Sequence, residues 1–253
     1  MASSYIRPDW PAPATVLALS TLRQAGRSGA PYHGFNLAAH VGDDPAAVQA
    51  NREILSQALP PGCRVQWLSQ VHGTTVVEAG QGEEVPEADA CWTRAPGLAC
   101  AVLTADCLPV LLCSRQGDVV AAAHAGWRGL LGGVLESTLA AMGAAAGDVL
   151  AWLGPAIGPA AFEVGSEVRE QFLEAAPAAD VSATDALFSP SGNRSGHYFT
   201  DLHALARLRL AAAGVRRVFG GGECTLSDRE RFFSYRRDGI TGRMASLILL
   251  EPG

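Results

Sequence analysis

The sequence predicts a single globular domain of the α+β class. Nearly half of its 253 residues are hydrophobic and 17% are charged, which is typical of a chain that folds around a core. Short apolar runs and helical-period segments are mixed irregularly, and several runs are joined by links of hairpin length, which favours α+β over a strictly alternating parallel sheet. We find no internal repeat and no long linker, and the polar stretch 180–196 is only a weak candidate boundary.

The N-terminal residues 1–14 are expected to be an extended lead-in, followed by one catalytic domain over 15–253. Three prolines, at positions 8, 11 and 13, disfavour helix in this segment. Tyr5 or Trp10 is expected to dock it on the domain.

The first half of the domain is expected to contain strands at 16–22, 64–68 and 74–79. A helix is predicted between them at 45–59, because Asp44 can cap its first turn and Pro45 is tolerated there. Pro60-Pro61-Gly62 ends this helix, and an acidic loop is expected at 80–88.

The centre of the chain holds apolar runs at 98–104, 109–113 and 119–124. The turn 114–117 joins the last two as a hairpin. Apolar residues then recur at helical spacing, which predicts one helix over 129–142.

The last third predicts strands at 149–153, 215–219 and 245–250. Helices are expected at 166–176, with Ser166 as cap, and from Thr200 or Asp201 to about 213. The stretch 180–196, rich in Gly, Pro and Ser, is expected to be a surface loop.

Composition excludes several classes of partner. The net charge is −6 and no basic stripe is present, so nucleic acid is not an expected ligand. No signal peptide or membrane span is predicted, and the six cysteines form no C-x-x-C pair. A reduced, cytoplasmic protein without a membrane partner is expected. The sequence does not fix the oligomeric state, and a monomer is compatible with it.

His72, Cys107 and His124 are the candidate metal ligands. Each stands at a predicted strand end or turn, from which a scaffold can direct side chains into one cleft. Imidazole nitrogen and thiolate sulfur suit zinc, or copper where redox chemistry is needed. Three protein ligands leave a coordination position open, as in catalytic sites. The alternative is that the three are unrelated core and turn residues.

Asp106 and Arg128 are the neighbouring candidates. Asp106 could accept a hydrogen bond from a ligating His or carry a proton, or it could be a turn carboxylate bonded to nearby backbone. Arg128 lies at a strand-to-helix junction that would suit a phosphate, or that simply turns tightly around Trp127.

Six segments together resemble one family, the YfiH-type laccase-domain proteins, also called polyphenol oxidase or purine nucleoside phosphorylase family proteins. The segments are Phe-Asn-Leu to Asn-Arg (35–52), Gln-Val-His-Gly (70–73), Thr-Ala-Asp-Cys-Leu-Pro-Val (104–110), Ala-His-Ala-Gly-Trp-Arg-Gly (123–129), Leu-Gly-Pro-Ala-Ile-Gly-Pro (153–159) and Phe-Phe-Ser-Tyr-Arg-Arg-Asp (232–238). They occur in order from about residue 15 to the C-terminus. Ala38 departs from the family pattern, where Gly is usual.

The resemblance implies packed mixed β-sheets flanked by helices, with zinc on the residues matching His72, Cys107 and His124. It also implies phosphorolysis of adenosine, inosine and 5′-methylthioadenosine, with adenosine deamination as a companion activity. Copper and polyphenol oxidation are attributed to the family as well.

The resemblance implies that a purine nucleoside and phosphate are the substrates, and it suggests roles for residues at the family's motif positions. Arg128 or Arg52 is assigned to phosphate, and Gln70 and Asn36 to the nucleoside. Cys107 and Asp106 are assigned to catalysis. Three alternatives stay open: a metal-free hydrolase with Cys107 as nucleophile, a copper oxidase, and a non-enzymatic zinc module.

Overall fold

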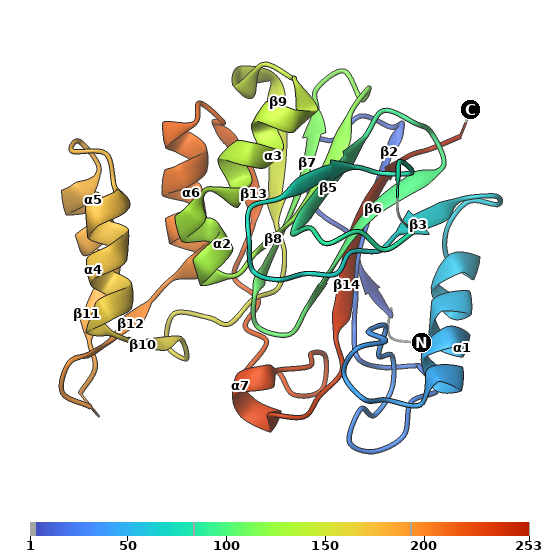
Figure 1. The fold of residues 1–253 in the computed structure, drawn as a ribbon, viewed down its shortest axis with the longest axis horizontal. Helices are drawn as coiled ribbons and strands as arrows, with labels where there is room; N and C mark the ends of the chain where they lie inside the picture. Colours follow the sequence, from blue (N-terminus) through green and yellow to red (C-terminus); the bar gives the residue numbers. More distant parts are fainter. Residues whose placement is uncertain (1–3, 83, 193, 253) are drawn as a thin grey trace.

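The protein is described by a computed structural model covering residues 4–82, 84–192 and 194–252. Two mixed β-sheets pack face to face, with helices on both outer faces (Figure 1). The predicted α+β class is therefore confirmed.

The first sheet has the strand order β1-β2-β14-β6-β3. Its strands are β1 (Tyr5–Ile6), β2 (Val16–Thr21), β3 (Arg64–Gln66), β6 (Leu98–Thr104) and β14 (Met244–Leu250). β14 is antiparallel to both neighbours, and β3 is parallel to β6. The C-terminal strand thus lies at the centre of this sheet, and residues 5–6 of the N-terminal segment form its edge.

The second sheet has the order β13-β9-β7-β8-β5-β4. Its strands are β4 (Val76–Glu78), β5 (Ala90–Thr93), β7 (Leu108–Ser114), β8 (Val120–Ala125), β9 (Val149–Leu153) and β13 (Arg217–Gly220). β7 and β8 form the predicted hairpin, and β5 was not predicted. Both central strands are buried along their whole length, as expected for a sheet covered on two faces.

The core lies in three layers. Between the sheets, Leu111 and Val120 pack with Val102 and Ile248. Helix α1 (Pro45–Gln57) covers the free face of the first sheet. Helices α3 (Val134–Met142) and α6 (Leu202–Ala212) cover the second, and α4 (Ser166–Ala175) lies farther out from this sheet (Figure 1).

Two helix caps follow the sequence prediction and one does not. The Asp44 side chain accepts the Ala46 N–H, and Asp201 accepts the N–H groups of His203 and Ala204. Gly165, rather than Ser166, precedes the first turn of α4, without a side-chain cap. The Ser166 prediction is therefore wrong.

The helix predicted over 129–142 is two helices, α2 (Trp127–Gly132) and α3. Gly133 separates them with φ 98°, a left-handed conformation that glycine adopts without strain. The apolar periodicity of the sequence continues across Gly133, so periodicity alone could not predict that the helix ends there and a new one begins.

The prediction of a surface loop over 180–196 is wrong. It contains helix α5 (Val181–Asp185) and strand β11 (Phe188–Pro190). β11 completes a small sheet with β10 (Glu163–Gly165) and β12 (His197–Thr200). Among the described residues, no helix combines the length and the apolar composition needed to cross a bilayer.

Candidate metal centre and its cleft

His72, Cys107 and His124 meet where the two sheets are connected. His72 lies between β3 and β4, and Cys107 lies in the short link between β6 and β7. Each link crosses from one sheet to the other, whereas His124 sits within β8. One ligand atom from each of the three side chains lies within 4.8 Å of the other two. Residues far apart in sequence therefore form one cluster of N and S donors.

Two of the connections have unusual backbone geometry. His72 has φ 63° and Asp106 has φ 92°, although neither is glycine. Side chains adopt this left-handed region rarely, and such residues concentrate at functional sites. The turns hold His72 and Cys107 toward a common point.

Asp89 holds both histidines in position through hydrogen bonds. The sequence analysis did not single out this residue. Its buried carboxylate accepts the backbone N–H groups of Val71, His72 and Gly73, at 3.2, 2.9 and 2.6 Å. It also accepts Nδ1–H of His124 at 2.8 Å. One side chain thus holds the turn that carries one histidine and orients the ring of the other.

The Asp89 bond determines which nitrogen of His124 can bind a ligand. Because Nδ1 donates to Asp89, Nε2 is the nitrogen left for the cluster, and it can bind a metal ion once it gives up its proton. The rings of His72 and His124 meet edge to face at 4.8 Å, and Nε2 of His72 lies 3.7 Å from Cys107 Sγ.

Electrostatics favour the thiolate form of Cys107. Burial alone would raise its pKa, but the charge of His124 and hydrogen bonds from both histidines lower the pKa to about 6. Burial likewise disfavours charge on His124, but Cys107 and Asp89 raise its pKa to about 9. A thiolate is the form of cysteine that binds a metal ion or acts as a nucleophile.

Glycines let helix α2 approach the cluster closely. A Cβ on Gly126 would lie 3.0 Å from both Cys107 Sγ and His72 Cδ2. A Cβ on Gly129 would lie 2.9 Å from the Gly73 carbonyl oxygen. The Gly-Trp-Arg-Gly segment is therefore a packing surface against the ligand turns.

The cluster opens into a cleft of about 400 Å³. His40, Gln70, Leu103, Thr104, Ala105, Tyr235 and Arg243 line it with the three candidate ligands. The Arg243 guanidinium lies 5.7 Å from the Tyr235 ring centroid and donates to the carbonyls of Thr241 and Gly242. The sequence prediction missed Arg243, whose only local signal is its place directly before the last strand.

Gln70 is the one predicted substrate-binding residue that lines the cleft. Its amide exchanges two hydrogen bonds with the backbone of Leu103, at 2.8 and 2.9 Å. Asn36 is fully buried outside the cleft, where its side chain accepts the N–H groups of Ala38 and Arg243. It supports the segment carrying Arg243 rather than facing the cleft.

Neither arginine assigned to phosphate lines the cleft. Arg52 stacks on Trp67 at 4.3 Å, donates to the Leu37 carbonyl and borders another cavity. Arg128 is exposed and stacks on Trp127.

Asp106 is not among the residues that line the metal cleft. Its carboxylate accepts hydrogen bonds from the hydroxyls of Thr225 and Ser234 and from the Arg236 N–H. These bonds tie the Cys107 link to helix α7 (Tyr235–Asp238).

Comparisons with known proteins identify the family. Residues 17–251 match a family model described as multi-copper polyphenol oxidoreductase laccase. A Pseudomonas aeruginosa protein named purine nucleoside phosphorylase is 54% identical over 249 residues, covering 98% of this chain and 99% of that protein. Escherichia coli purine nucleoside phosphorylase YfiH is 51% identical, with the same coverage of both chains.

Solved structures agree with the sequence matches. A Neisseria meningitidis protein superposes with a TM-score of 0.91 at 49% identity, covering 99% of this chain and 100% of that one. YlmD from Geobacillus stearothermophilus superposes with a TM-score of 0.88 at 31% identity, covering 100% and 98%. The chain therefore belongs to the YfiH family of laccase-domain enzymes.

Proposed function

We propose that this protein is a zinc-dependent purine nucleoside phosphorylase. The observation that carries the proposal is the convergence of His72, Cys107 and His124 within 4.8 Å at the base of a cleft. The names of the similar Pseudomonas and Escherichia proteins support the reaction class. Adenosine, inosine and 5′-methylthioadenosine are the proposed substrates, with adenosine deamination as a second activity. Residues 15–253 are the proposed catalytic unit, and a cytoplasmic location stays a prediction.

The donor set fits zinc. Two imidazole nitrogens and one thiolate match the ligands of catalytic zinc sites, which keep a further position for water or substrate. Asp89 supplies the carboxylate that usually bonds the other nitrogen of a ligating histidine. Zinc bound there would act as a Lewis acid that activates water or stabilises negative charge.

The protein's own residues suit the binding of phosphate and nucleoside. Phosphorolysis requires phosphate to attack C1′ of the ribose while the purine leaves, through a transition state with positive charge on the sugar, by analogy with glycoside cleavage. Arg243 lines the cleft and is our assignment for phosphate, in place of Arg52 and Arg128. The exposed Tyr235 ring beside it offers a flat surface for the base. Gln70 shapes the cleft through Leu103, and a proton-carrying role for Asp106 stays a prediction.

Product analysis tests this function. Purified protein is incubated with adenosine, with and without phosphate. Phosphorolysis yields adenine and ribose 1-phosphate only when phosphate is present, whereas deamination yields inosine in both conditions. Absence of both products, in protein shown to contain zinc, would refute the proposal. An Arg243→Gln variant should raise KM for phosphate about tenfold or more, because a charge-assisted contact is lost.

A metal-free cysteine hydrolase is the second candidate. The 3.7 Å approach of Cys107 to His72 also suits a thiolate nucleophile beside a base. Activity that survives complete zinc removal would favour this candidate. Polyphenol oxidation at copper is the third, but among the described residues a single three-donor group was found, fewer ligands than a multicopper array needs.

A further inference from the structure

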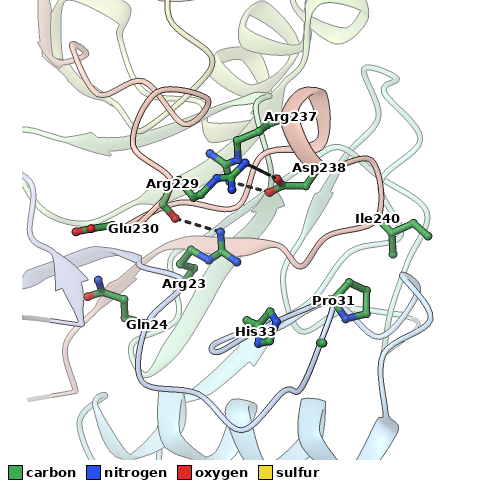
Figure 2. Close-up of a pocket in the computed structure, with 10 residues that line it drawn as sticks. Arg23, Gln24, Pro31, His33, Arg229, Glu230, Arg237, Asp238 and Ile240 are labelled. Carbon is green, nitrogen blue, oxygen red and sulfur yellow. Dashed lines mark hydrogen bonds and ion pairs between the residues drawn. The ribbon is translucent and has the colours of Figure 1, made fainter.

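A second cavity shares no lining residue with the metal cleft, although both draw on the C-terminal stretch 229–243. It has a volume of about 920 Å³ and lies between the loop around Pro31 and the stretch from Arg229 to Ile240 (Figure 2). Tyr235 and Arg243 of the same C-terminal region line the metal cleft, whereas Arg237 and Asp238 line this cavity. The two sites are therefore separate.

The cavity carries an excess of positive charge. Arg23, Arg229 and Arg237 line it together with Asp238 and Glu230, three cationic side chains against two carboxylates. Figure 2 shows Glu230 turned away from the three arginines, so Asp238 is the carboxylate among them. A locally positive cavity is unusual on a chain with net charge −6.

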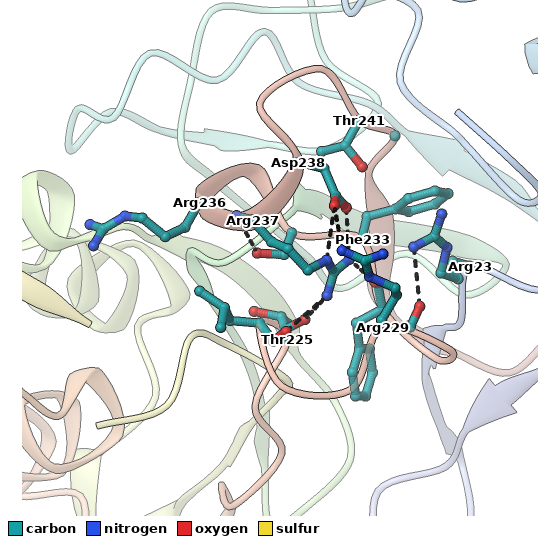
Figure 3. A network of polar contacts seen from close by, with 12 residues as sticks. Arg23, Thr225, Arg229, Phe233, Arg236, Arg237, Asp238 and Thr241 are labelled. Carbon is teal, nitrogen blue, oxygen red and sulfur yellow. Dashed lines mark hydrogen bonds and ion pairs between the residues drawn. The ribbon is translucent and has the colours of Figure 1, made fainter. Parts of the chain in front are cut away.

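The Arg237 side chain is engaged in hydrogen bonds within the protein. Its side chain is 10% exposed and donates to the carbonyls of Thr225, Leu226 and Phe232 (Figure 3). It also forms a two-point ion pair with Asp238, at 2.8 and 3.0 Å. Asp238 is thus engaged mainly by Arg237, Arg229 reaches the same carboxylate only at 3.9 Å, and among the described residues Arg23 has no ion pair.

Arg23 and Arg229 keep donors for a ligand. Arg23 is half-buried over the Phe233 ring and donates through Nη1 to the Arg229 carbonyl at 3.1 Å. The Arg229 side chain is 72% exposed and lies 3.9 Å from Asp238. Burial and the charge of Arg237 lower the pKa of Arg23, with Arg229 adding to this and Asp238 opposing it. The cluster is thus short of negative charge.

The walls of the cavity also suit an organic group. Ala30, Pro31 and Ile240 line it together with the arginines, and Ile240 is 63% exposed. The volume falls in the range of about 300–1,000 Å³ typical of small-molecule sites and exceeds that of a bare anion.

We propose that this cavity binds a small phosphomonoester, with the phosphate held by Arg23 and Arg229 and the organic part against Pro31 and Ile240. The arginine fork matches phosphate oxygens in pairs, which favours this chemistry. Free phosphate shares the same recognition and should bind more weakly.

Calorimetric titration tests the proposal. Inorganic phosphate and ribose 5-phosphate are titrated separately into wild-type protein at constant ionic strength set with chloride, which controls for screening. The variants are Arg23→Gln and Arg229→Gln, with the exposed Arg216→Gln as matched control. Arg229 provides a variant that should fold, because its side chain is mostly exposed.

We expect saturable binding, tighter for ribose 5-phosphate, that either variant weakens about tenfold or more and that Arg216→Gln leaves unchanged. Binding that is unchanged in both variants, or that falls equally in the control, overturns the proposal. Ribose 5-phosphate binding should persist in Arg243→Gln, which removes the proposed cleft contact. This result separates a failure here from a failure of the proposed phosphorolysis.

Discussion

At the residue scale, Asp89 is the side chain on which the geometry of the centre depends most. It accepts four hydrogen bonds, three from the turn carrying His72 and one from His124. Asparagine at this position would have one acceptor oxygen and an amide that must donate. The turn and the ring would then compete for the remaining oxygen.

We therefore predict that Asp89→Asn lowers zinc affinity about 10–100-fold, as is usual when the partner of a ligating histidine is lost. Competition with a fluorescent zinc chelator measures this. The exposed Asp9→Asn is the control and should bind zinc normally. Wild-type affinity in Asp89→Asn would show that the hydrogen bonds do not position the ligands.

The sequence identified candidate ligands more readily than the residues that support them. His72, Cys107 and His124 stood out as polar side chains beside apolar strands. Asp89 stands in a similar apolar setting, between Ala88 and Ala90, but its partners lie 16 to 35 residues away along the chain. No local pattern reports such pairings, and the same holds for Arg243.

At the element scale, the close packing of α2 against the ligand turns gives a prediction for Gly126. A methyl group there would lie 3.0 Å from Cys107 Sγ and His72 Cδ2, so both side chains must move. We expect Gly126→Ala to reduce zinc affinity and phosphorolysis together. Gly147→Ala is the matched control, because its added Cβ would meet no atom within 4 Å. Equal behaviour of the two variants would contradict the packing argument.

Helix α6 gives a prediction about stability. The Asp201 side chain accepts the first N–H groups of the helix, so Asp201→Ala should cost about 0.5–2 kcal/mol in urea unfolding. Asp180 precedes α5 without a capping hydrogen bond, so Asp180→Ala should change stability little. A comparable loss in both variants would disprove the capping role.

The same cap predicts a pH dependence. Hydrogen bonding to His203 and the Ala204 N–H, only partly opposed by burial, lowers the pKa of Asp201. The folded protein therefore holds this carboxylate ionised more strongly than the unfolded chain. The stabilisation is complete above the unfolded pKa of about 3.9 and is lost as the pH falls through the folded value. The difference in unfolding free energy between wild type and Asp201→Ala should shrink accordingly in acid.

Helices and strands could be predicted from the sequence where a single local pattern, such as a cap or a buried apolar run, determines them. Asp44, Pro45 and apolar spacing determined α1, and the buried runs gave β6 to β9. The break at Gly133 and the strand β11 depend on tertiary packing, which neither periodicity nor loop composition reports.

At the scale of the whole molecule, the candidate centre joins the two sheets. The links carrying His72 and Cys107 each cross from the first sheet to the second, so an ion bound to both would tie the sheets together. Under the proposed function, zinc would bind the assembled site far better than the unfolded chain.

Zinc should therefore raise Tm. At a free concentration of 100 times Kd it would add about 2.7 kcal/mol, or roughly 5–10 °C for a chain of this size. Scanning calorimetry of zinc-loaded and chelated protein measures the shift. A Tm that does not depend on zinc would argue against a site shared by the two sheets.

The most direct test compares zinc content and phosphate-dependent nucleoside cleavage in wild type, Cys107→Ala and the control Cys63→Ala. Cys63 is half-buried directly before β3, outside the residues that line the metal cleft. We predict about one zinc per chain in wild type and Cys63→Ala, and a joint loss of zinc and cleavage in a folded Cys107→Ala protein. Cleavage at the wild-type rate in Cys107→Ala would contradict the assignment of the centre.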